Sequence, residues 1–150
     1  MTPTAWADLP NAKHIDRILA DLEKNPDKWN AAWSAERYAA WSTERYAAWD
    51  AARDAAWNAA RGDARDAAGD AARNAVWNAA ETAERYAART AASDAAWYAA
   101  WGATLALITY DDCAYLLDEK PEHVQILGLL GNEKAILLYP ACVALQKEMA

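Results

Sequence analysis

Two adjacent carboxylates, Asp111 and Asp112, stand inside the most apolar stretch of the 150-residue chain, TLALITYDDCAYLL at residues 104–117. Burying a carboxylate without a partner is costly. The pair could therefore serve as a general acid and base or, with His14 or His123, hold a metal ion. Alternatively, one carboxylate pairs with an arginine while the other reaches solvent or a helix N-terminus. Because neighbouring residues on a helix point about 100° apart, we favour this second role and expect structural, buried acids.

The other reactive residues form no catalytic or metal-binding motif. Cys113 and Cys142 are the only cysteines and lack CxxC spacing, and a buried cysteine usually acts as a small apolar residue. His14 and His123 show no HxH or HExxH pattern, and GxGxxG, P-loop and GxSxG patterns are absent. We therefore expect no catalytic residue, metal or cofactor, and a hydrolase using Asp111 and Asp112 is the least favoured hypothesis.

Aromatic and arginine side chains are better suited to specific binding. The chain has nine Trp and seven Tyr but no Phe, so every ring carries a hydrogen-bonding group. Rings stack on bases, and arginine grips phosphates. Residues 29–104 carry eight Arg and no Lys against ten acids, a net charge of −2, which favours a nucleotide ligand over a duplex. The alternative is that the rings form a core with the arginines as its salt-bridged rim.

These side chains recur every four residues. Between residues 29 and 104 most tetrads begin with Trp or Arg and end in alanine, as in WNAA and RDAA. An eight-residue unit is also visible in SAERYAAW (residues 34–41) and STERYAAW (residues 42–49). The side chains expected to bind a ligand lie in and around these duplicated units: Arg37, Tyr38, Trp41, Arg45, Tyr46 and Trp49.

The four-residue period limits how long each helix can be. Alanine is the strongest helix former, and no proline lies between residues 27 and 120. Four residues overshoot a helical turn by about 40°, so the Trp/Arg stripe would circle an unbroken helix in about nine tetrads. We therefore predict several helices, with breaks at residues 61–63 and 69–70 and a weaker one at 93–94, where Gly, Ser or Asp disfavours the helix interior. We expect Ala-to-Ala helix contacts, with Trp beside them and Arg stacked on rings or paired with Asp.

Ordinary helices flank the array. Asn11 could cap an amphipathic helix, and Asn25-Pro26 begins the next one. Residues 104–117 should form a buried helix, and residues 121–130 a short amphipathic helix closed by Gly131. Asn132 should cap a last helix through Met149, which Pro140 kinks or interrupts. The predicted fold is a single all-α domain, a compact multi-helix bundle with an N-terminal helix (1–28), the tetrad array (29–104) and a Leu-rich C-terminal helical hairpin (105–150).

Composition narrows the function classes. The formal net charge is −7, the sequence pI is about 4.8 and 55% of the residues are hydrophobic. No apolar run approaches the roughly 18 residues of a spanning helix, and the N-terminus lacks the features of a signal peptide. We expect a cytoplasmic protein whose partners include neither duplex nucleic acid nor a membrane.

The array, together with LITYDDCAYLLD (residues 107–118) and ILLYPACVAL (residues 136–145), resembles a group of small, Ala-rich bacteriophage and prophage proteins. The array alone is also similar to bacterial immunity proteins. This resemblance implies an accessory protein that acts in the host cytoplasm during phage–host conflict, and it carries over no catalytic residue. The leading hypothesis is a non-enzymatic binding protein that occupies a host defence protein or sequesters a nucleotide second messenger. The second is an assembly protein that forms a homo-oligomer through its aromatic seam.

Overall fold

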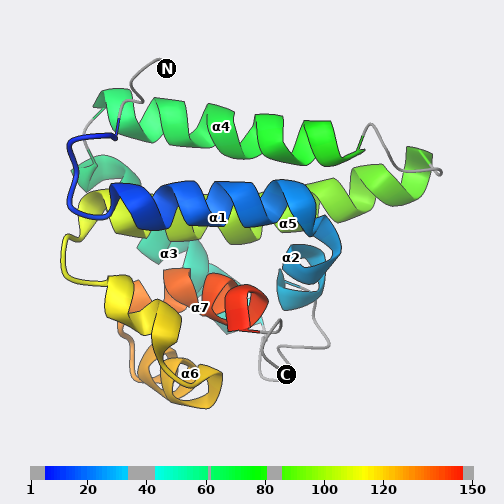
Figure 1. Cartoon of the computed structure of the whole chain (residues 1–150). Coiled ribbons are helices and arrows are strands. Elements are labelled where there is room, and N and C mark those ends of the chain that lie inside the picture. Colours follow the sequence, from blue (N-terminus) through cyan, green and yellow to red (C-terminus); the bar gives the residue numbers. More distant parts are fainter. Residues whose placement is uncertain (1–5, 34–42, 61, 81–85, 147–150) are drawn as a thin grey trace.

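The computed structural model describes residues 6–33, 43–60, 62–80 and 86–146, and within them the chain is all-α (Figure 1). None of the helices in these ranges is both long and apolar enough to cross a membrane. The elements are α1 (Ala12–Lys24), α2 (Pro26–Trp33), α3 (Thr43–Ala59), α4 (Gly62–Ala80), α5 (Tyr86–Thr109), the 3-10 helix η1 (Ala114–Asp118), α6 (Pro121–Leu129) and α7 (Glu133–Gln146).

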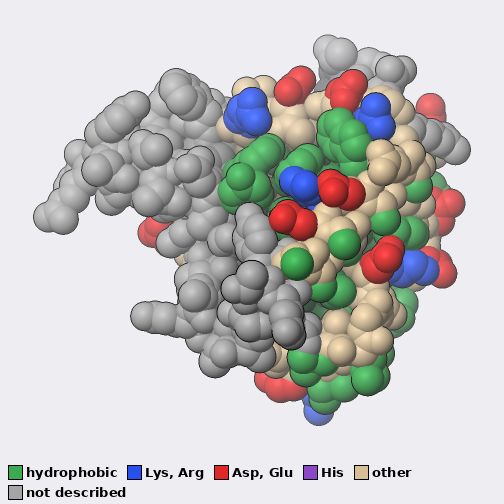
Figure 2. Space-filling model, turned by 180° about the vertical axis from the view of Figure 1, so that it is seen from behind, with side chains coloured by type: hydrophobic (Ala, Val, Ile, Leu, Met, Phe, Trp, Pro, Cys, Tyr) green, Lys and Arg blue, Asp and Glu red, His purple; other side chains and the backbone are tan. Residues whose placement is uncertain are grey.

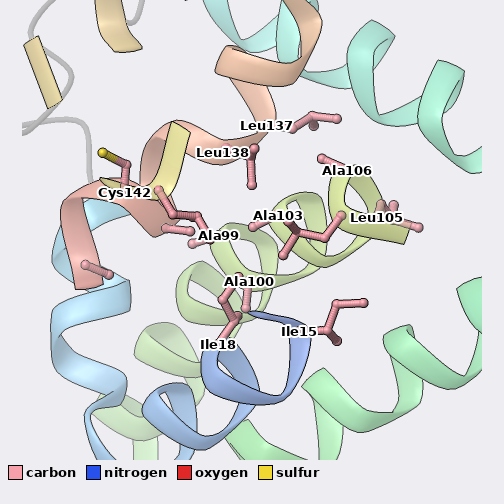
Figure 3. Close-up of a cluster of buried hydrophobic side chains, with 14 of the residues drawn as sticks. Ile15, Ile18, Ala99, Ala100, Ala103, Leu105, Ala106, Leu137, Leu138 and Cys142 are labelled. Carbon is pink, nitrogen blue, oxygen red and sulfur yellow. The ribbon is translucent and has the colours of Figure 1, made fainter. Parts of the chain in front are cut away.

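Helix α5 is the centre of the bundle. It contacts α1, α2, α3, α4 and α7, while α6 packs on α7 at one end of the molecule (Figure 1). Figure 3 shows Ile15 and Ile18 of α1 and Leu137 and Leu138 of α7 on opposite sides of α5. The facing residues of α5 are small, including Ala99, Ala100 and Ala103, and all are fully buried. Small residues let neighbouring helices approach closely, so the larger side chains of α1 and α7 supply most of the buried apolar area.

The tetrads explain which residues of α3 and α4 are buried. Most described alanines in the fourth slot are buried, whereas second-slot residues are half-exposed or exposed. At the end of α4 the pattern moves: first-slot Arg73 is exposed and third-slot Ala75 is buried. This change is the expected drift of about 40° per tetrad. The buried fourth-slot residues are Ala52, Ala56, Ala64, Ala68 and Ala72.

The structure confirms one of the predicted breaks and corrects two. Helix α3 ends at Ala59 and α4 begins at Gly62, as expected. Helix α4 continues through Gly69-Asp70, however, and α5 continues through Ser93-Asp94. A glycine inside a helix costs about 0.5–1 kcal/mol relative to alanine. The packing of α4 on both α1 and α5 outweighs such a local preference.

The end of α5 also differs from the sequence prediction. The expected helix over residues 104–117 ends at Thr109, and a turn at residues 111–112 leads into η1. Asn11 occupies the N-cap position of α1, but its side chain makes no hydrogen bond to that helix. The Asn11 Nδ2 instead donates to the carbonyl oxygens of Leu107 and Tyr110, each at 3.0 Å. The buried asparagine therefore caps the C-terminus of α5 and ties the start of α1 to it.

The C-terminal hairpin follows the sequence prediction closely. The Gly131 N–H donates to Gly128 O and the Asn132 N–H to Leu127 O, a Schellman turn in which Gly131 has φ +91°. The Asn132 Oδ1 accepts from the Ala135 N–H at 3.0 Å and caps α7. Helix α7 is not interrupted at Pro140, which lies inside it. Its predicted continuation to Met149 lies outside the described residues.

Candidate functional site

The duplicated units fall largely outside the part of the chain that the structure describes. Arg37, Tyr38 and Trp41 lie there, and so do the side chains of Arg45 and Tyr46, although their backbone belongs to α3. Trp49 is the described member of the expected ligand-binding set. It is fully buried, so in this structure it offers no ring face to a ligand.

Trp49 is instead wedged against α5. A Cβ atom added to Gly102 would lie 3.0 Å from Cζ2 and 3.1 Å from Nε1 of the Trp49 ring. The ring also meets Tyr98 edge to face, with centroids 6.0 Å apart. The close approach favours glycine at position 102, and the tryptophan has a packing role.

Further tetrad rings continue this packing between α3, α4 and α5. Trp97 and Trp101 of α5 are stacked, with centroids 4.9 Å apart and planes 7° from parallel. Trp57 of α3 meets Trp101 edge to face at 6.0 Å. Together with Trp49 and Tyr98, and with the arginines that stack on them, these rings form what we call the aromatic–arginine cluster: Trp49, Arg53, Trp57, Arg65, Arg73, Trp97, Tyr98 and Trp101.

The arginines of the cluster lie over its rings. The Arg53 guanidinium is 5.1 Å from the Trp101 ring centroid and pairs with Asp54 at 2.8 Å. The Arg65 guanidinium is 4.5 Å from the Trp57 centroid and donates to the Trp57 carbonyl oxygen at 3.0 Å. The expected stacking of Arg on rings and pairing with Asp is therefore confirmed in the described helices. Much of the hydrogen-bonding and charge-pairing capacity of these two cations is already used within the chain.

Other polar groups of the cluster have no partner among the described residues. The Nε1 atoms of Trp97 and Trp101 are buried and have no hydrogen-bond acceptor in this part of the chain. Arg73 lies over Trp97, 5.1 Å from the centroid, and no carboxylate among the described residues pairs with it. An unsatisfied buried N–H costs about 1–3 kcal/mol, so the cluster retains a small capacity for an additional acceptor.

Asp111 and Asp112 are exposed, which corrects the expectation that they are buried acids. Because α5 ends before them, neither carboxylate enters the core. Lys134 Nζ lies 3.0 Å from Asp112 Oδ1. This hydrogen bond to Lys134 lowers the pKa of Asp112 from its ordinary value, and Asp112 in turn raises the pKa of Lys134. Asp112 is therefore ionised at neutral pH and unsuited to act as a general acid.

Both cysteines are buried and free. Burial raises the pKa of Cys113 to about 12 and that of Cys142 to about 12. Cys142 Sγ donates to the carbonyl oxygen of Glu119, as does Gln146, and the two side chains hold the end of η1 against α7. A thiol needs to ionise to act as a nucleophile, so both cysteines have structural roles. The described residues contain no cluster of three or more His, Cys, Asp or Glu that could hold a metal ion.

No family model, curated protein or solved structure matches this chain. The evidence on function therefore comes from the side chains on the surface of the described part of the molecule. Among the described residues on the face opposite that of Figure 1, Figure 2 shows acidic and basic side chains interspersed among hydrophobic ones, without one large basic patch. Hydrophobic side chains also gather at the lower end of that face, the end at which Figure 1 places α6.

Helix α6 presents large apolar side chains to solvent. Ile126 is 54% exposed, Leu129 51% and Leu130 78%. Leu130 is the C-cap residue of α6. At spacings of three and four residues from Ile126, Leu129 and Leu130 lie on the same side as Ile126, and we call the three residues the α6 face. The opposite side packs on α7, where Val124 and Gly128 are buried. The predicted amphipathic helix is thus confirmed as a helix, but the C-terminal part of its solvent side is apolar.

The segment of the chain that contains α6 is acidic. Residues 110–134 carry six carboxylates and two lysines, a net charge of −4 with histidine neutral. Glu122 precedes Ile126 by one helical turn and is exposed. Of the two lysines, Lys134 is paired with Asp112. The carboxylates are those of Asp111, Asp112, Asp118, Glu119, Glu122 and Glu133.

A sequence signal for the α6 face was present. The segment from Val124 to Leu130 holds five large apolar residues in less than two turns of helix. A helix that buries one side needs an apolar stripe of about 100°, and five such residues in seven positions exceed it.

Proposed function

We propose that this protein is a non-enzymatic binding protein that docks another protein through the α6 face. The observation that carries the proposal is the exposure of Ile126, Leu129 and Leu130 side by side on one helix. Contiguous exposed apolar side chains on a folded domain commonly mark an interaction site. A helix face with anchors at such spacing fits a partner groove or a partner helix.

Burial of the three side chains would supply part of the free energy that a specific complex needs. Completing the burial of an Ile or Leu side chain that is half exposed contributes about 1 kcal/mol, half of the roughly 1.5–3 kcal/mol for full burial. Three such side chains form an apolar centre of the kind that dominates binding energy in protein interfaces. The surrounding carboxylates supply the polar rim.

The chemistry of the described residues supports binding over catalysis. Cys113 and Cys142 are protonated at neutral pH, because burial raises the pKa of each to about 12. Asp112 is exposed and ionised. The resemblance to bacteriophage proteins supports a host defence protein as the partner, with the host cytoplasm as the place of action.

A comparative capture experiment tests this function. The wild-type protein and the variant Ile126→Gln/Leu129→Gln/Leu130→Gln are immobilised and exposed to the same host-cell lysate. Because the substituted side chains are exposed, the variant should keep its fold. The control Ala51→Gln places glutamine at an exposed position of α3. A protein captured by the wild type and the control but lost with the triple variant supports the proposal, whereas identical capture by all three proteins would overturn it.

The aromatic–arginine cluster supports a second candidate, sequestration of a nucleotide second messenger. The favouring observation is Arg73, which has no carboxylate partner among the described residues and lies over Trp97, whose Nε1 lacks an acceptor. Arginine forks hold phosphates and indole faces stack on bases. Thermal-shift measurements with cyclic and linear nucleotides test it. Stabilisation that Arg73→Gln abolishes supports this function, and no shift with any nucleotide refutes it.

A further inference from the structure

We infer that the occupant of the α6 face is a basic amphipathic helix of a partner protein, an inference that rests on the proposed docking function. The apolar side chains of the face are arranged along a helix, with Ile126 one turn before Leu129 and Leu130. An apolar stripe on a partner helix with the same spacing can pack along them, as ridges pack into grooves.

The negative charge of the segment that contains α6 indicates which polar side chains a partner would carry. Residues 110–134 carry the net charge of −4 described above, and Asp118, Glu122 and Glu133 are exposed. Asp112 pairs with Lys134, Glu119 contacts His123 and Glu133 accepts a hydrogen bond from Tyr110, whereas no described ion pair or hydrogen bond engages the side chains of Asp118 and Glu122. Lysine or arginine flanking the partner's apolar stripe would pair with them, and complementary charge accelerates and orients association.

The same charges disfavour two other occupants. A second copy of this chain docked face to face would bring two acidic rims together, and like charges across an interface are unfavourable. An anionic membrane surface would be repelled for the same reason. The C-terminus of α6, beside Leu129 and Leu130, adds the negative end of a helix dipole and again favours a cationic partner.

Three fluorescent helical peptides test this inference. They have equal length and one identical leucine stripe, and their polar positions carry lysine, glutamine or glutamate. Binding to the full-length protein is measured by fluorescence anisotropy at low and high salt. The lysine peptide should bind at least about ten-fold more tightly than the glutamate peptide, and its affinity should fall with salt.

Two substitutions near α6 test whether the lysine peptide binds at the α6 face, and a third on α4 serves as the control. Leu130→Gln should weaken the lysine peptide about ten-fold. Glu122→Gln should weaken it about two- to five-fold, as expected for an exposed charge pair. Asp70→Asn removes the same formal charge from an exposed position on α4 and should have no effect. Equal losses from Glu122→Gln and Asp70→Asn would show attraction to overall charge and would overturn the inference.

The remaining outcomes separate the inference from the proposed function. If the glutamine or glutamate peptide binds as tightly as the lysine peptide and Leu130→Gln weakens it, the partner chemistry is wrong but docking at the α6 face stands. Self-association that Leu130→Gln abolishes, seen by sedimentation, would identify a second copy as the occupant and refute the inference. Binding to phosphatidylserine vesicles through Leu130 would refute it in favour of a membrane. Unchanged peptide binding by Leu130→Gln, together with equal lysate capture by the triple variant, would refute both proposals.

Discussion

Alanine substitutions at two helical glycines should have opposite effects on stability. Both Gly69 and Gly102 lie inside helices, so replacing either with alanine gains about 0.5–1 kcal/mol of helix stability. The added Cβ at Gly69 would meet Trp101 Nε1 at 3.7 Å, an ordinary contact. The added Cβ at Gly102 would lie 3.0–3.3 Å from three atoms of the Trp49 ring.

Whether Gly102→Ala raises or lowers the free energy of unfolding depends on whether the Trp49 ring can move. The ring is fully buried against α5 and Tyr98, and overpacking a filled site costs about 1–3 kcal/mol. Subtracting the helix gain leaves a net loss of up to about 2.5 kcal/mol for Gly102→Ala. Gly69→Ala should instead stabilise by about 0.5–1 kcal/mol.

Urea unfolding followed by circular dichroism gives the change in the free energy of unfolding for both variants, provided that the dependence of this free energy on urea concentration is the same as in the wild type. In a Trp49→Leu background the clash is removed, so Gly102→Ala should become neutral or stabilising there, and this double-mutant cycle isolates the contact. If Gly102→Ala stabilises the wild-type protein as much as Gly69→Ala does, Trp49 does not pack on α5 as the structure places it.

Three other predictions concern the ends of helices and the titratable groups. Asn11→Ala should destabilise the protein by about 1–3 kcal/mol in urea unfolding, because two carbonyl oxygens at the end of α5 lose their donor; no loss would show that the cap is unimportant. Cys113 and Cys142 should resist a thiol reagent at pH 8 until the protein unfolds, because burial raises the pKa of each to about 12; rapid labelling of the native protein would contradict their burial. Lys134 lowers the pKa of Asp112, so their pairing stabilises the fold above the ordinary carboxyl pKa and loses this effect as the pH falls through the lowered value. Between pH 7 and pH 3 the melting temperature should therefore fall less for Asp112→Asn than for the wild type. A larger fall for Asp112→Asn would contradict a stabilising pairing of Asp112 with Lys134.

The sequence predicted the features that depend on local chemistry and helical geometry. The drift of burial from the fourth slot at Ala72 to the third slot at Ala75 follows directly from a four-residue period. Gly131 and Asn132 were predictable because few residue types suit the turn between α6 and α7. The pairing of Arg53 with rings and carboxylates followed from the tetrad composition.

Features that depend on contacts between distant segments were not predictable. Asn11 was expected to cap α1, and its side chain instead serves carbonyl groups almost one hundred residues away. The end of α5 at Thr109 moved Asp111 and Asp112 from a predicted core helix to an exposed turn. The helical periodicity of the sequence shows which sides of α6 are apolar. It does not show which of these sides packs against α7.

A nuclear magnetic resonance titration tests most directly which surface of this protein binds a partner. Methyl signals of isoleucine and leucine report on Ile126, Leu129 and Leu130, and indole N–H signals report on Trp97 and Trp101 in the same sample. Addition of the lysine peptide should shift the three α6 residues and leave both indoles unchanged, and nucleotides should leave the α6 methyl signals unchanged. Indole shifts with a nucleotide, combined with α6 methyl signals that no peptide perturbs, would contradict docking at the α6 face and favour the aromatic–arginine cluster as the binding site.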